Sequence, residues 1–164
     1  MRAVMDSIEI LTRAGMILSE QTAWTKNAYV RDQKARPMQN LLHHDACRFS
    51  IIGAITHVQG VLPENPKRAQ ARCCIDLSII ELFPERAVVP HHETRSIPFF
   101  NDHPDTKHED VVAVMRLALL LAKDHQRFIH LTRSEKVRRK LFLPKRKLVP
   151  PKNFPRTAFK NRFS

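Results

Sequence analysis

The basic residues of this chain are concentrated in its last 32 positions, and this segregation limits what the remainder can fold into. Residues 133–164 contain twelve Lys and Arg side chains and one acid, Glu135, whereas residues 1–132 contain 16 bases and 15 acids. A segment of net charge +11 repels itself and gains little by packing alone. We therefore expect a folded domain over residues 1–132, followed by a basic, proline-containing C-terminal arm over residues 133–164.

The scarcity of glycine favours helices over a β-sandwich or a barrel. The chain has only 3 glycines but 11 prolines, and all-β folds need many tight turns. Apolar residues make up 43% of the chain, which is enough for one hydrophobic core. We predict a mainly α fold, a single compact domain of three to four helices with an extended basic arm.

Apolar side chains recur at helical spacing in several segments. The spacing predicts helices at about residues 5–20, 45–57 and 67–83, the second of them led by Asp45. A further helix, over about residues 106–128, begins with Thr106-Lys107-His108-Glu109, which fits the capping box. These segments are expected to form the core.

Proline separates the predicted helices and limits the arm. Four prolines between residues 84 and 104 predict an extended or looped segment there. Asn101 and Asp102, at the end of that segment, are expected to form a turn into the Thr106 cap; the alternative is a polar pocket in front of a helix N-terminus. In the arm a short basic helix is expected at Ser134–Leu143, and the four prolines that follow predict an extended chain.

Several short sequence motifs occur in an order that resembles a known family. They are Trp24 after an early helix, the run Ala46–Ile55 (ACRFSIIGAI) and Phe99–Asp102 (FFND) ahead of the helix that contains Val111. Over about residues 8–122 this order is similar to a family of small domains of unknown function found in phages and bacteria. The resemblance implies one compact, mostly helical domain without an assigned activity. It singles out Cys47, Gly53, Asn101 and Asp102.

The arm has the composition of a nucleic-acid-binding segment. Its bases can contact phosphates, and four interspersed phenylalanines can stack on unpaired bases. We expect little base specificity and contacts with nucleic acid or a ribonucleoprotein from Arg138, Arg139, Lys140, Lys145, Arg146, Lys147, Lys152 and Arg156. The alternatives are a solvated tail without a specific role, and an arm that holds an acidic protein, as in a phage-type inhibitor or structural subunit.

A thiol hydrolase is the second alternative. In such an enzyme Cys47 would be the nucleophile, His91 or His92 the base, and Asn101 or Asp102 the orienting group. We favour a structural role instead, with Cys47 a small buried hydrophobe inside the central helix. The protein is therefore expected to bind rather than to catalyse.

A metal site is also not expected, and neither is a cofactor. His44 and Cys47 would share a face of the predicted central helix, but their spacing to other possible ligands is not a recognised one. Adjacent cysteines on a helix point about 100° apart and do not easily bind one ion. The other ligands considered are His43, His57, Cys73, Cys74, His91 and His92.

Location follows from what the sequence lacks. It contains no apolar run near the roughly 20 residues that span a bilayer, and acids at Asp6 and Glu9 interrupt any secretory signal. Three cysteines form no disulfide frame. We expect a cytoplasmic protein with no membrane partner.

Overall fold

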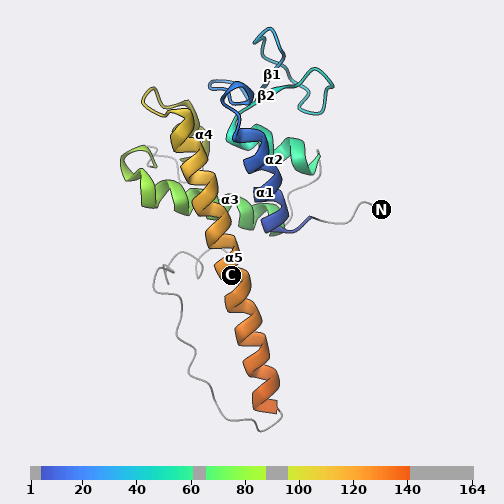
Figure 1. The fold of residues 1–164 in the computed structure, drawn as a ribbon, viewed down its shortest axis with the longest axis vertical. Coiled ribbons are helices and arrows are strands. Elements are labelled where there is room, and N and C mark those ends of the chain that lie inside the picture. Colours follow the sequence, from blue (N-terminus) through green and yellow to red (C-terminus); the bar gives the residue numbers. More distant parts are fainter. Residues whose placement is uncertain (1–4, 61–65, 88–95, 141–164) are drawn as a thin grey trace. The chain divides into compact units, whose positions relative to one another are not determined.

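The computed structural model describes residues 5–60, 66–87 and 96–140, and of residues 127–140 it describes the backbone alone. The mainly α fold is confirmed, with five α-helices in the described ranges, one more than the upper limit expected, and a small two-stranded sheet (Figure 1). The chain divides into two units, residues 1–122 and residues 123–164. The packing described below is that of the first unit.

The elements follow one another in a simple order. They are α1 (Ser7–Leu18), the 3-10 helix η1 (Gln21–Ala23), β1 (Val30–Arg31), β2 (Arg48–Phe49), α2 (Ile51–Gln59), α3 (Pro66–Leu82), the 3-10 helix η2 (Pro84–Arg86), α4 (Ser96–Asp102) and α5 (His108–Lys140). Helices α1 and α3 lie close to their predicted ranges. The remaining helices differ from the prediction, each for a physical reason.

Helix α1 is central to the core. The Asp6 carboxylate caps it by accepting a hydrogen bond from the Glu9 amide at 2.8 Å. The helix packs against both α2 and α3, and Figure 1 shows α1 (blue) running beside α2. At its C-terminal end the Leu18 carbonyl lies 2.8 Å from His108 Nε2, which ties α1 to the start of α5. The fully buried apolar side chains include Ile10, Leu11, Leu18, Val30, Ile51, Ile55, Ile75, Ile79, Phe100, Val111 and Val114.

Helix α2 begins six residues later than predicted, so the expectation that Asp45 leads it is wrong. Phe49 pairs with Val30 in the antiparallel β1–β2 sheet, which holds residues 48–49 extended. Ser50 then caps the helix, because its Oγ accepts a hydrogen bond from the Gly53 amide at 3.1 Å. The apolar residues Ala46 and Phe49 therefore belong to a loop and a strand, although their spacing matches a helical face.

Helix α4 lies in the segment that was predicted to be extended or looped. Pro98 is its third residue, and a proline is tolerated there because the first turn of a helix needs no intrahelical N–H donor. The helix buries Ile97 and Phe100 and packs against α3, α2 and η2. The predicted turn at Asn101 and Asp102 is also wrong, because both residues belong to the last turn of α4.

The start of α5 differs from the predicted capping box. The Thr106 hydroxyl accepts a hydrogen bond from Arg86 Nη1 at 3.1 Å, whereas Asp110 Oδ2 accepts one from the Lys107 amide at 3.0 Å. Asp110 also pairs with Arg86 at 2.9 Å. Burial alone would raise the pKa of Asp110, but the bonds from the Lys107 amide and the Arg86 guanidinium outweigh it and lower the pKa. A partly buried ion pair therefore anchors this helix end.

Helix α5 is also longer than predicted. It continues without a break to Lys140. Two helices were expected here, one ending near residue 128 and a short basic one at Ser134–Leu143. As far as Lys140 they are a single helix. The first eight residues of the predicted arm are thus helical, and the rest, residues 141–164, lie outside the described residues. None of the described helices has the length and apolar character needed to cross a membrane.

Candidate functional site

Asn101 is the centre of a buried hydrogen-bond network that joins three parts of the fold. Its side-chain oxygen Oδ1 accepts from Trp24 Nε1 at 3.1 Å and from the Ile51 amide at 3.2 Å. Its Nδ2 donates to the Thr25 carbonyl at 3.1 Å and to Asp102 Oδ1 at 2.7 Å. Both amide protons and both oxygen lone pairs are used, so Asn101 fastens α4 to the start of α2 and to the segment after η1.

Asp102 extends this network towards the surface. Its Oδ1 also accepts from the Asn27 amide at 2.8 Å. Asn27 has φ of 57°, a left-handed conformation that asparagine tolerates better than most residues. The exposed carboxylate therefore holds a bend in the chain immediately before Tyr29 and β1.

Gly53 allows the chain before β1 to approach α2 closely. An added Cβ at this position would lie 1.9 Å from the Tyr29 carbonyl oxygen, a distance that no side chain could occupy. The same carbonyl accepts a hydrogen bond from the Ser50 amide at 3.0 Å. The first turn of α2 thus lies directly on the backbone at Tyr29.

These contacts surround an open pocket at the N-terminal end of α2. Its cavity volume is about 430 Å³, and its lining residues are Asn27, Ala28, Tyr29, Ser50, Ile52, Pro98, Asn101 and Asp102. The size falls within the range of small-molecule sites. Asn101 and Asp102 thus help to line a pocket, but it lies at the start of α2, these residues form the end of α4, and the described lining residues include none from α5.

The lining of this pocket combines one exposed aromatic ring with a few polar groups. Its eight lining residues, all of them described, include no histidine or cysteine, and the Ser50 hydroxyl is used as a helix cap. The Tyr29 side chain is 59% exposed and the Asp102 carboxylate faces solvent, so the rim offers an aromatic ring and an acceptor. The lining residues provide no nucleophile and base in contact.

Cys47 lies outside this pocket and outside any helix, which corrects the expectation that it is part of the central helix. It stands immediately before β2 and is half-buried. Its Sγ donates to the Arg31 carbonyl at 3.7 Å, and its backbone amide donates to the same oxygen at 3.1 Å. The hydrogen bonds given above for Asn101 and Asp102 do not involve Cys47. His91 and His92, the bases considered for a thiol hydrolase, lie outside the described residues.

Among the described residues that were weighed as metal ligands, no cysteine lies in a cluster with the histidines, and His91 and His92 lie outside the described residues. Cys73 and Cys74 lie on α3, where burial raises the pKa of Cys74 to about 12, so that its thiol stays protonated at neutral pH. His57, on α2, lies with its Nδ1 2.7 Å from the Leu41 carbonyl. His44 and Cys47 do not share a helix face, because no helix forms there.

The predicted nucleic-acid-binding residues are described only in part. Arg138, Arg139 and Lys140 are the last three residues of α5, and their side chains lie outside the described part. Lys145, Arg146, Lys147, Lys152 and Arg156 fall in residues 141–164, also outside it.

Sequence reasoning did not identify the partners of Asn101. Trp24 and Ile51 are 77 and 50 residues away, and no local pattern connects such positions. The resemblance did give a signal, since the three motifs that carry it contain Trp24, Ser50–Gly53 and Asn101–Asp102, which meet at this site. A residue of these motifs can be required for the fold alone. Asn101 is an example, because its side-chain amide is fully used in hydrogen bonds within the protein.

The comparisons with known proteins agree with that resemblance. A family model described as "Family of unknown function (DUF6197)" matches residues 4–119. The match runs from the start of α1 into α5 and ends before the basic C-terminal residues. No curated protein and no solved structure matches the chain.

Proposed function

We propose a function from this chain's own residues, because the chain belongs to DUF6197, a family of unknown function. The protein is a non-catalytic binding protein whose C-terminal residues 133–164 contact nucleic acid, or an assembly that contains it, with little sequence specificity. The observation that carries the proposal is the net charge of +11 in these 32 residues. Phosphate contacts by many bases release counterions, which is the main source of non-specific affinity.

The length of α5 supports this proposal. Between Lys123 and Lys140 the chain carries seven Lys and Arg residues against two acids, all of them on one continuous helix. The consecutive bases at 138–140 stand about 100° apart around the helix axis. Bases at consecutive helical positions do not share one face, which is compatible with phosphate contacts that carry no sequence information.

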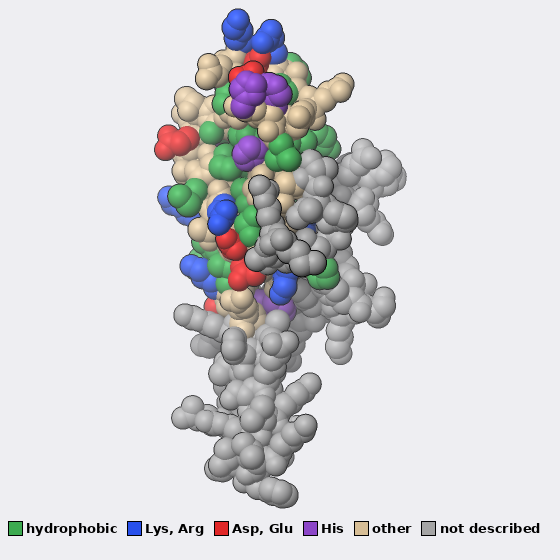
Figure 2. Space-filling view, turned by 90° about the vertical axis from the view of Figure 1, so that its right-hand side faces the viewer, with side chains coloured by type: hydrophobic (Ala, Val, Ile, Leu, Met, Phe, Trp, Pro, Cys, Tyr) green, Lys and Arg blue, Asp and Glu red, His purple; other side chains and the backbone are tan. Residues whose placement is uncertain are grey.

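The folded body contributes almost none of the protein's net positive charge, which comes from residues 133–164. Residues 1–132 are nearly neutral, and Figure 2 shows basic (blue) and acidic (red) side chains interspersed on one face of the described part. Several body cations are used internally: Arg31 binds the Ala35 carbonyl, Arg36 pairs with Asp32, and Arg86 pairs with Asp110. We further propose a cytoplasmic location, with which the odd number of cysteines in the sequence is compatible.

The test is a titration of the full chain with fluorescent single-stranded and double-stranded RNA and DNA, repeated over a range of salt concentrations. The key variant replaces Lys145, Arg146 and Lys147 with glutamine. If each of these bases contacts a phosphate of a single strand, the slope of log K against log salt falls by about 2, because each contact contributes about 0.7. The matched control removes the same charge from the body, in the exposed residues Lys34, Lys67 and Lys107.

The outcomes separate the alternatives. A reduced salt slope in the arm variant, with an unchanged slope in the control, supports the proposal. Equal losses in both variants would mean that net charge alone matters and that the arm has no special role. If the full chain binds no oligonucleotide at moderate salt, the proposal is wrong, and binding of polyglutamate would favour an acidic protein partner.

A further inference from the structure

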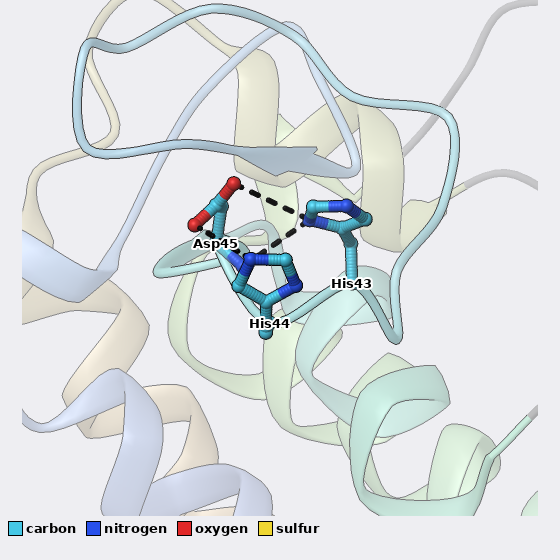
Figure 3. A group of neighbouring side chains, drawn as sticks. All are labelled: His43, His44 and Asp45. Carbon is cyan, nitrogen blue, oxygen red and sulfur yellow. Dashed lines mark hydrogen bonds and ion pairs between the residues drawn. The ribbon is translucent and has the colours of Figure 1, made fainter.

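His43, His44 and Asp45 form a compact side-chain cluster on the loop between β1 and β2 (Figure 3). His43 Nδ1 lies 3.6 Å from Asp45 Oδ2, and His44 Nε2 lies 3.4 Å from Asp45 Oδ1. One ligand atom of each residue lies within 4.8 Å of the other two. We propose that this cluster binds a divalent transition-metal ion of the Zn²⁺ type through two imidazole nitrogens and one carboxylate oxygen, with water completing the coordination.

The separations fit an ion better than they fit direct hydrogen bonds. Ligand atoms held at about 2.0–2.1 Å from a tetrahedral ion stand about 3.3–3.4 Å from one another. A charge-assisted bond between an imidazole and a carboxylate is shorter, at about 2.7–2.9 Å. The observed 3.6 Å to Oδ2 and 3.4 Å to Oδ1 of Asp45 are longer than such a bond and close to the separation of two ligands, although they involve the two different oxygens of the carboxylate.

The backbone of the cluster is held on both sides, so binding needs side-chain rotation and little else. Before the cluster, the Leu41 carbonyl lies 2.7 Å from His57 Nδ1 on α2. Within it, the Ala46 amide donates to the His43 carbonyl at 3.0 Å, and after it the Cys47 amide donates to the Arg31 carbonyl at 3.1 Å. Such preorganisation lowers the entropy lost when an ion binds.

One ring must turn for both nitrogens to reach the ion. The two imidazoles are stacked, with centroids 4.3 Å apart and planes at 29°, so their in-plane lone pairs run nearly parallel. The His44 side chain is 83% exposed, so most of its surface faces solvent and it is the ring that we expect to turn. The ion would also replace the long 3.3 Å hydrogen bond from the Asp45 amide to His43 Nδ1, and the freed amide is exposed to water.

The donor set defines the class of ion. Two imidazoles with one carboxylate suit zinc, copper or nickel, whereas calcium and magnesium prefer oxygen ligands alone. This inference is independent of the proposed nucleic-acid binding, because it concerns a loop of the body and not the arm.

The chain contains a matched control for this cluster. His103 Nδ1 lies 3.8 Å from Asp105 Oδ2 and accepts a hydrogen bond from the Asp105 amide at 3.3 Å, as in the His43–Asp45 turn, but Pro104 stands where the second histidine would be. If the second imidazole is what makes an ion site, this turn binds zinc far more weakly.

The experiment titrates the full chain with Zn²⁺ by calorimetry and follows the histidine ring signals by NMR. The expected result is one zinc per chain with shifts at His43 and His44. Affinity should fall at least about tenfold in His44→Ala and in Asp45→Asn, and should be unchanged in Asp105→Asn. The three cysteines are present in every variant, so any contribution of theirs is common to all, and circular dichroism verifies folding.

Two results would overturn the inference. One is equal zinc affinity in the wild type, His44→Ala and Asp45→Asn. The other is a set of NMR shifts at other histidines with no change at His43 and His44, which would place the ion elsewhere.

Discussion

Replacing Gly53 with alanine is expected to destabilise the protein, although the same substitution stabilises most helices. In a helix interior alanine is favoured over glycine by about 1 kcal/mol. At Gly53 the new Cβ would lie 1.9 Å from the Tyr29 carbonyl oxygen, 2.9 Å from its carbon and 3.3 Å from Ser50 Oγ. The first two atoms belong to the backbone, so the chain before β1 must move away from α2.

That movement has a cost that can be estimated. Overpacking of a tight contact costs about 1–3 kcal/mol, and loss of the 3.0 Å bond between the Ser50 amide and the Tyr29 carbonyl costs about 1 kcal/mol more. After the helix-propensity gain is subtracted, we expect a net loss of about 1–3 kcal/mol. The loss should appear as a lower urea midpoint in denaturation followed by circular dichroism.

Gly15 is the internal control. It lies within α1, and an added Cβ there would stand 4.0 Å from Met115 Cβ, an ordinary van der Waals contact. Gly15→Ala should therefore stabilise the protein by about 0.5–1 kcal/mol. The two substitutions have opposite predicted signs, so the reasoning would be refuted by a Gly53→Ala variant that is as stable as the wild type or more so.

Two other substitutions test the buried polar groups. Asn101→Leu should lower the free energy of unfolding by about 3 kcal/mol or more, because Trp24 Nε1 and the Ile51 amide lose their acceptor; a loss below about 1 kcal/mol in urea denaturation would contradict the network. Asp110→Asn should cost about 1–3 kcal/mol at pH 7 through its partly buried, charge-assisted pair with Arg86. Because the pKa of Asp110 is lowered on folding, its contribution is complete above the unfolded value near 4 and is lost as the pH falls through the folded value. The stability difference between wild type and Asp110→Asn should therefore be largest at pH 7 and shrink towards pH 3, and a difference that does not change with pH would show that the carboxylate charge is not the cause.

The helices that sequence analysis placed well are those with long apolar periodicity. The 12 residues of α1 and the 17 of α3 repeat apolar residues on a buried face, and little competes with that signal. Helix α2 began late because Phe49 matches the helical period but pairs with Val30 across the chain. Such long-range pairing leaves no local signature.

Helix α4 was missed because it is short and contains a proline. Seven residues give too few turns for a periodic signal, and Pro98 reads as a breaker unless its place in the first turn is known. The pocket at the start of α2 was not predicted, because Asn101 depends on Trp24, Thr25 and Ile51, which the fold alone brings to it. The loop cluster was not predicted at all, since the sequence reasoning placed His44 on a helix.

The tryptophan bound to Asn101 also reports on the order of folding events. The chain has one tryptophan, and its indole bond to Asn101 closes a separation of 77 residues. Contacts of such long sequence separation form late, after the local turns of α1 and α3 can already be helical. In a refolding experiment, Trp24 fluorescence would follow the docking of α4, while ellipticity would follow helix formation, so one unlabelled sample can resolve the two steps in time.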